Sequence, residues 1–311
     1  MSNTPPRRSR ARARQYEARH RRPGLAVSRL TIMSVLAVVL CVVLFFGYLL
    51  LEPKLLQVEQ RTVITSALSS DVKQLRIVYV SDIHYGAWPY LTESDLTDLF
   101  STINAQNPDL VLLGGDYAQD SESAIAFFEH LPRIRSSYGV WGVLGNHDRT
   151  LPESNLARLR TAMIQANVTP IVNEVMSVRV GKQDIYLAGL DDVTGGWPDL
   201  NGVASQCRQS DLVIFLCHNP DIIPDALNAA DAQGNKGWFD LGFFGHTHGG
   251  QIKLLGRLLG VGHLDGLYTD GWYSPTRSTT LLVSRGAGTS VLPFRLGCRP
   301  QIHVITIKSQ E

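Results

Sequence analysis

The sequence has few cysteines, no internal repeat and no tract of biased composition beyond its first thirty residues. Four cysteines in 311 residues are too few for a disulfide-stabilised scaffold. The 27 glycines follow no three-residue period, which excludes a collagen-like fibre. With 44% apolar and 18% charged residues, the chain is too hydrophobic for global disorder. These absences leave a folded protein of one large domain or two ordinary ones.

Net charge is almost absent, but the charged residues are unevenly placed. The total is +1, yet residues 1–30 hold nine arginines against one acid, Glu17. Residues 31–311 therefore keep 20 basic and 27 acidic side chains, a net charge of −7. A basic run can bind nucleic acid, but this one lies beside a long apolar segment, which favours the flank of a membrane helix. We therefore expect a basic arm over 1–29 and no nucleic-acid partner.

Residues 30–51 contain no charged side chain. A helix of this length spans roughly 33 Å, enough to cross the hydrocarbon core of a bilayer. A buried core helix would show a polar stripe, and a cleaved signal peptide would be shorter and followed by small residues. The segment has neither feature. The sequence thus predicts a retained transmembrane helix over 30–51, followed by a linker over 52–74.

The same arginines predict an orientation for a single-pass protein of the cell membrane. Only Lys54 and Arg61 follow the apolar segment closely, whereas nine arginines precede it. The positive-inside rule then places the N-terminus in the cytoplasm and the body, residues 75–311, outside it.

The body alternates short apolar runs with helical or loop stretches. Five runs end in Asp, Asn or His, and they cover residues 76–82, 110–116, 140–146, 212–218 and 241–246. Their length and their β-branched or aromatic content predict buried strands. Amphipathic helices are expected after Thr92 and over 121–131 and 154–167. This alternation predicts an α/β fold.

Polar side chains that can bind metals follow these strands. They are Asp82 and His84, then Asp116, then Asn146, His147 and Asp148, then His218, and finally His246 and His248. In open α/β sheets, ligands collect beyond the carboxyl ends of the strands, so these side chains could converge. A pair of hard-to-borderline cations needs mixed oxygen and nitrogen ligands and one bridging carboxylate. This set contains both.

In this order, the motifs D-x-H, G-D, G-N-H-D, H and G-H-T-H resemble those of the calcineurin-like metallophosphoesterase superfamily. The resemblance covers about residues 76–307. The stretches GHTHGGQIK (245–253) and VSRGAGTSVLPFRLGCR (283–299) are similar to the membrane-associated bacterial YaeI/YkuE-like phosphodiesterase branch. The fold that this resemblance implies is a pair of packed β-sheets flanked by helices.

The resemblance also implies two divalent ions (Mn, Fe or Zn) and a role for each matching residue. Asp82, His84 and His248 would hold the first ion, Asn146, His218 and His246 the second, and Asp116 would bridge them. A hydroxide bridging the ions would attack phosphorus, and His147 would protonate the leaving oxygen.

Two further expectations concern the surroundings of these residues. In the phosphoprotein phosphatase branch, an Asp three residues after the bridging Asp steadies the acid histidine, but here that position is Gln119. Asp148 or another group is therefore expected to orient His147. Arg285 and Arg295 are candidates for binding the substrate phosphate, because a guanidinium group matches its geometry. The alternative for both is an ordinary surface arginine.

Together these features predict a membrane-anchored, metal-dependent phosphoesterase that acts on a phosphodiester or phosphomonoester of an envelope or lipid-linked substrate. A UDP-2,3-diacylglucosamine pyrophosphatase is the alternative within this class, but its nucleotide substrate is cytoplasmic. A non-catalytic metal-binding scaffold is the alternative from another class, although such a protein should have lost ligands. Among the cysteines of the body, Cys207, Cys217 and Cys298, two could pair but not all three.

Overall fold

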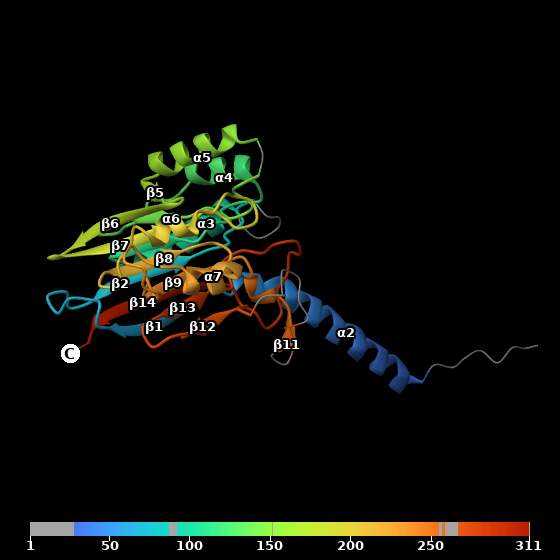
Figure 1. The fold of residues 1–311 in the computed structure, drawn as a ribbon. Helices are drawn as coiled ribbons and strands as arrows, with labels where there is room; N and C mark the ends of the chain where they lie inside the picture. Colours follow the sequence, from blue (N-terminus) through green and yellow to red (C-terminus); the bar gives the residue numbers. More distant parts are fainter. Residues whose placement is uncertain (1–27, 87–91, 151, 255–256, 259–266, 311) are drawn as a thin grey trace, which may run out of the picture. The chain divides into compact units, whose positions relative to one another are not determined.

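The computed structural model describes residues 28–86, 92–150, 152–254, 257–258 and 267–310 (Figure 1). The predicted basic arm, residues 1–29, therefore lies almost wholly outside the described residues. The chain divides into two units, residues 1–48 and 49–311. Helix α2 (Arg29–Leu51) makes up the described part of the first unit and ends just inside the second. It is long and apolar enough to cross a membrane, and it coincides with the segment predicted to do so.

The second unit contains two six-stranded β-sheets. The first sheet holds, in spatial order, β1 (Gln57–Thr65), β14 (Gln301–Ser309), β2 (Leu75–Val80), β3 (Leu110–Leu113), β4 (Val140–Gly142) and β5 (Val168–Pro170). Strands β2 to β5 run parallel to one another, and β14 is antiparallel to β2. Three parallel strands that carry predicted ligands, β2, β3 and β4, are therefore neighbours.

The second sheet holds β12 (Gly271–Tyr273), β13 (Thr280–Val283), β9 (Leu241–Phe244), β8 (Leu212–Leu216), β7 (Gln183–Gly189) and β6 (Glu174–Val180). Its four inner strands are parallel, and the edge strands β12 and β6 are antiparallel to their neighbours. A separate two-stranded ribbon is formed by β10 (Lys253–Leu254) and β11 (Arg257–Leu258). The ligand-bearing strands β8 and β9 are adjacent here as well.

The two sheets pack face to face, and helices cover their outer faces (Figure 1). The first sheet is covered by α3 (Glu93–Ala105), α4 (Ser121–Glu129) and α5 (Ser154–Gln165), and the second by α6 (Leu200–Ala204) and α7 (Ile223–Asn228). Along β2, Ile77 and Tyr79 face the other sheet, whereas Val78 and Val80 face the helices. Burial on both faces explains the uninterrupted apolar runs of the sequence. The predicted α/β fold with two packed sheets is confirmed.

The local signals for α3 also act as the sequence predicts. The Thr92 side chain accepts a hydrogen bond from the Asp95 amide, and the Asp95 side chain accepts one from the Thr92 amide. This reciprocal capping box fixes the first turn of the helix. Leu96, Leu99 and Phe100 are then buried on the face that covers the sheet.

Residues 52–74 are not the linker that their composition suggests. Strand β1 pairs over its whole length with β14, from Gln57 opposite Gln301 to Thr65 opposite Ser309. Just before it, in the short helix η1 (Glu52–Lys54), the buried Glu52 carboxylate accepts hydrogen bonds from the amides of Gly297 and Cys298, at 2.9 and 2.6 Å. An edge strand buries only part of its surface, so β1 keeps polar residues and its sequence resembles a linker.

The cysteines of the body form no disulfide in the described chain. Cys207, Cys217 and Cys298 are all buried free thiols. Cys207 and Cys217 pack in the core outside the second sheet. Cys298 instead places its Sγ 3.3 Å from the carbonyl oxygen of His248. The pairing that the sequence left open is therefore absent from this structure.

Candidate metal centre

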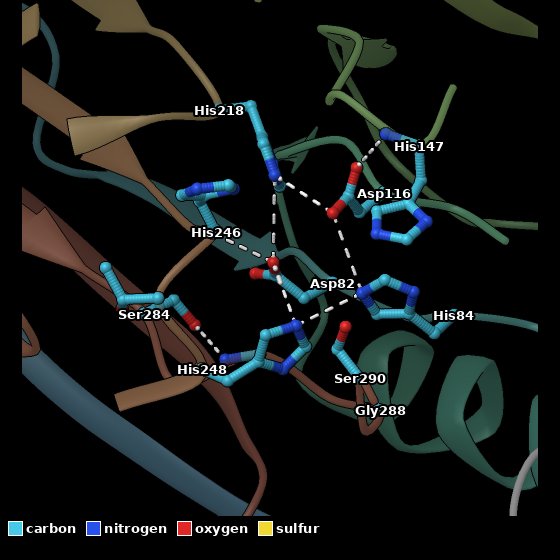
Figure 2. Close-up of polar contacts among 12 residues, drawn as sticks. Asp82, His84, Asp116, His147, His218, His246, His248, Ser284, Gly288 and Ser290 are labelled. Atoms are coloured by element: carbon cyan, nitrogen blue, oxygen red, sulfur yellow. Dashed lines mark hydrogen bonds and ion pairs between the residues drawn. The ribbon is translucent and has the colours of Figure 1, made fainter. Parts of the chain in front are cut away.

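The strand ends of both sheets bring the predicted ligands to one place. These ligands are Asp82 and His84 after β2, Asp116 after β3, Asn146 after β4, His218 after β8, and His246 and His248 after β9. Figure 2 shows Asp82, Asp116 and the histidines at 84, 218, 246 and 248 turned toward a common centre. Residues more than 160 positions apart thus become neighbours, because the carboxyl ends of the two sets of parallel strands meet.

One group of donor atoms consists of Asp82, His84 and His248. The Nε2 atoms of His84 and His248 lie 3.1 Å apart. Asp82 Oδ1 is 3.6 Å from His248 Nε2, and one ligand atom from each of the three residues fits within 4.8 Å. Two imidazole nitrogens and a carboxylate oxygen at this spacing can hold one metal ion.

A second group consists of Asp116, His218 and His246, with Asn146 at its side. Asp116 Oδ2 lies 3.1 Å from His218 Nε2, and Asn146 Oδ1 lies 3.0 Å from His246 Nδ1. The same Asp116 oxygen lies 3.6 Å from His84 Nε2, in the first group. Asp116 is thus the carboxylate that stands between the two groups.

In the group of Asp82, His84 and His248, two neutral histidines and a carboxylate oxygen without a partner suit a bound cation. Burial raises the pKa of Asp82 to about 6 and lowers that of His84 to about 4, because low-dielectric surroundings disfavour either charge. Burial also lowers the pKa of His248 well below its usual value, so both facing rings are neutral and can bind a metal. Asp82 Oδ2 is buried and has no hydrogen-bond partner among the described residues. A divalent ion would supply the missing partner, and the mixed N and O donors suit Mn, Fe or Zn.

The backbone at these positions is in an unusual conformation. Asp82, His84, Asp116, His246 and His248 all have positive φ, between 50° and 68°. Residues other than glycine rarely adopt this left-handed region, and holding one there costs about 1–3 kcal/mol. Five such residues in one site indicate that the surrounding structure holds the backbone in place to aim these side chains.

Two glycines allow the carboxylates to approach the backbone closely. A Cβ at Gly145 would overlap the Asp116 carboxylate, and a Cβ at Gly286 would lie 2.5 Å from the Cβ of Asp82. Gly286 also has φ +71°, which other residues avoid. Any side chain at either position would displace a candidate ligand.

His147 lies at the edge of the centre and is partly exposed. Its Nδ1 lies 2.8 Å from the backbone carbonyl of Gln119, and its own amide donates to Asp116 Oδ1. A carbonyl oxygen can only accept a hydrogen bond, so Nδ1 must carry a proton. Nε2 is then the ring nitrogen that is left for a substrate or a metal ion. Its ring packs edge-on against that of His84, and His147 could also share an ion with His84 and Asp116, since their ligand atoms fit within 4.8 Å.

The group that orients His147 is not Asp148, the one residue that the sequence suggested by name for this task. The buried Asp148 carboxylate accepts hydrogen bonds from the backbone amides of Asp116, Tyr117 and Gly145, at 2.7, 3.0 and 2.8 Å. It joins the loops after β3 and β4 and makes no hydrogen bond to the His147 ring. The carbonyl of Gln119 orients that ring instead, and a backbone carbonyl leaves no signal in a sequence.

The two candidate phosphate-binding arginines are both engaged within the protein. Arg295 is fully buried, and its guanidinium donates to the backbone carbonyls of Arg285, Gly288 and Cys298. Neither expectation for it, phosphate binding or an ordinary surface position, fits this burial. Arg285 is partly buried, and its Nε donates to Asp270 Oδ2 at 2.8 Å.

A loop within the stretch 283–299, outside the motifs that carry the predicted ligands, also borders the centre. The amides of Ala287 and Gly288 donate to the carbonyls of Ser81 and Asp82, and Figure 2 shows Gly288 and Ser290 beside His84 and His248. The run of small residues directly after β13 was the available signal, because only small residues let two backbones approach so closely.

The comparisons with known proteins agree with this geometry. The family model for calcineurin-like phosphoesterases matches residues 75–250. The metallophosphoesterase YkuE of Bacillus subtilis is 32% identical over 85% of this chain and 90% of its own length. The phosphodiesterase YaeI of Escherichia coli is 28% identical over 75% of this chain and 82% of its own length.

A relative from an animal also matches almost the whole chain. The transmembrane protein with a metallophosphoesterase domain of Bos taurus is 28% identical over 93% of this chain and 63% of its own length. The family model covers more than half of the chain, and YkuE matches nearly end to end. The chain therefore belongs to the calcineurin-like phosphoesterase family and is a metal-dependent phosphoesterase.

Proposed function

We propose that this protein is a membrane-anchored phosphoesterase with two divalent ions, acting on an envelope or lipid-linked phosphate ester. The observation that carries the two-ion assignment is the position of Asp116. It lies 3.1 Å from His218 and 3.6 Å from His84, on opposite sides of the centre. Asp82, His84 and His248 would hold one ion, Asn146, His218 and His246 the other, and Asp116 both.

The chain's own residues then have distinct tasks. The bound ions would supply Lewis acidity toward water and the phosphoryl oxygens. The amides of Asp116, Tyr117 and Gly145, held by Asp148, fix the loop that carries the shared carboxylate. His147 keeps its Nδ1 proton on the Gln119 carbonyl, and in the imidazolium form it would donate a second proton, from Nε2, to the departing oxygen. Arg295 is fully buried, so we assign it no role in binding the phosphate oxygens of the substrate.

Activity on simple esters tests this proposal against a non-catalytic scaffold. We expect the purified full-length chain in detergent to bind two Mn²⁺, Fe²⁺ or Zn²⁺ ions and to hydrolyse bis(4-nitrophenyl) phosphate or 4-nitrophenyl phosphate. A chelator should abolish turnover, and adding back the metal should restore it. Full metal content without turnover of either ester would instead support the scaffold.

Membrane anchoring is supported by the apolar helix Arg29–Leu51 and by the arginines that precede it. We expect a protease added to intact spheroplasts to digest the body of the protein. The control is a marker of known cytoplasmic location, which must stay intact, beside a known exported marker, which must be cut. A protected body would reverse the orientation and favour a cytoplasmic nucleotide-sugar substrate, as for a UDP-2,3-diacylglucosamine pyrophosphatase.

A further inference from the structure

A cavity of about 420 Å³ lies between η1 and helix α3, outside the metal centre. Pro53, Leu55, Leu56 and Leu99 form the apolar part of its wall, and half of its lining residues are polar or charged. Charged groups lie along the same cavity: Lys54 pairs with Asp95 at 2.7 Å, and the exposed Arg299 donates to the Leu55 carbonyl. An apolar wall with charged neighbours suits an amphiphile better than a sugar or a nucleotide.

The inner wall of this cavity is the loop that borders the metal centre. Ala287, Gly288 and Thr289 line it, and the Gly288 amide donates to the carbonyl of the candidate ligand Asp82 at 2.7 Å. Thr289 also lines a second hollow, of about 270 Å³, together with Ser290 and Gln119. Gln119 is the residue whose carbonyl orients His147. Thr289 thus lines both hollows, and Gln119 links the second of them to the residue proposed as the acid.

An exposed apolar residue stands at the lip of the second hollow. Val291 is 83% exposed and has φ +61°, a conformation that β-branched residues strongly avoid. The loop holds its shape because Gln251 accepts from the Ser290 amide and donates to the Leu292 carbonyl. A strained, exposed valine beside a catalytic centre points to an apolar ligand or surface.

The cavity is also close to the proposed bilayer along the chain. Helix α2 ends at Leu51, and Pro53 follows two residues later, so at most about 7 Å of chain separates the end of the helix from the cavity wall. This short chain segment keeps the cavity wall near the end of the helix, where the acyl chain of a lipid would be available to it.

We propose that the cavity between η1 and α3 binds the acyl chain of a membrane lipid whose phosphate ester is hydrolysed at the metal centre. The inference rests on the proposed function, because it assumes both the membrane helix and the phosphoesterase site. It assigns Leu55, Leu56 and Leu99 to chain binding and the loop Ala287–Ser290 to the passage between chain and phosphate.

A series of substrates with one leaving group and growing chains tests the proposal. We would measure kcat/KM of the full-length protein in nanodiscs for 4-nitrophenyl methyl, butyl and octyl phosphate. Each methylene that enters the cavity should raise kcat/KM about threefold or more, so four buried methylenes give on the order of 10²-fold. The decisive quantity is the octyl-to-methyl ratio.

Two variants block the cavity from opposite sides, Leu55→Glu with a charge and Thr102→Phe with bulk. Both should bring the octyl-to-methyl ratio close to one. The matched control is Leu131→Glu, since Leu131 is also a partly buried leucine that lines a hollow, one that shares no lining residue with this cavity. Leu131→Glu should keep the wild-type octyl-to-methyl ratio. Partition of the octyl ester into the bilayer is the same for all variants, so it cannot cause a difference between them.

The outcomes separate the two proposals. No hydrolysis of any of the three esters by the wild-type protein would overturn the proposed function itself. Hydrolysis of all three with a ratio near one would leave that function standing and overturn the acyl-binding cavity. A high ratio that survives in both Leu55→Glu and Thr102→Phe would overturn it as well.

Discussion

Replacing Asp116 by asparagine should lower metal binding at both sites and reduce phosphoester hydrolysis about 10³-fold, since a metal ion supplies several kcal/mol of charge stabilisation. Asp116 stands between His218 and His84, so its charge is the one that both ions would share. Asparagine keeps the size of the side chain and an oxygen that can accept from the His147 amide, as Asp116 Oδ1 does at 2.9 Å. Loss of the charge is therefore the main change.

The measurement is metal content per chain, alongside the rate. Asp184→Asn is the matched control, because Asp184 is a half-exposed carboxylate that pairs with Arg179 far from the centre in sequence and in sheet position. It should leave both metal content and rate unchanged. Two ions per chain in Asp116→Asn would contradict the shared position of this carboxylate, whatever the activity.

Replacing His147 by glutamine should leave both ions bound and slow the hydrolysis of alkyl esters by about 10²–10⁴, the usual contribution of a general acid. An alkoxide must be protonated as it leaves, and the proposed acid is His147, which would donate a proton from Nε2 in its imidazolium form while Nδ1–H stays on the Gln119 carbonyl. A nitrophenolate departs without a proton, so 4-nitrophenyl esters should lose little. The comparison of the two leaving groups in one variant separates an acid from a ligand.

His130→Gln controls for the loss of an imidazole as such. The Nδ1 of His130 also lies 2.8 Å from a backbone carbonyl, that of Ala126, but the residue is exposed at the end of α4. Its rates should match those of the wild type for both leaving groups. If His147→Gln releases metal and slows both ester types equally, then His147 binds an ion together with His84 and Asp116, and the acid has to be sought elsewhere.

The inner strands could be predicted because two sequence features mark each of them, an uninterrupted apolar run and a polar ligand at its end. Val78 and Ile77 face opposite sides of one sheet, and both sides are covered, so the whole run is apolar and ends where polar ligands begin. The order of the ligands along the chain then reveals the site even though no single motif does. The confirmed fold followed from these features together with the family resemblance.

The parts that could not be predicted depend on the backbone or on partial burial. The group that orients His147 is the backbone carbonyl of Gln119, and every residue has such a carbonyl. The sequence could therefore name only a side chain, Asp148, for this task. For Arg295 the sequence suggested phosphate binding or a surface position, because it carries no information on burial against backbone carbonyls. Strand β1 looked like a linker because an edge strand tolerates polar residues on its open side.

The pairing of β1 with β14 determines how far this enzyme can search for its substrate. Only five residues separate Leu51 from Gln57, where β1 begins, and Glu52 among them is fixed to the amides of Gly297 and Cys298. If α2 lies in a bilayer, no long flexible linker connects the catalytic domain to it, and the domain cannot move far from the membrane surface. Encounters with the proposed lipid substrate would then be two-dimensional, so the rate should depend on the mole fraction of that lipid in the leaflet rather than on its bulk concentration.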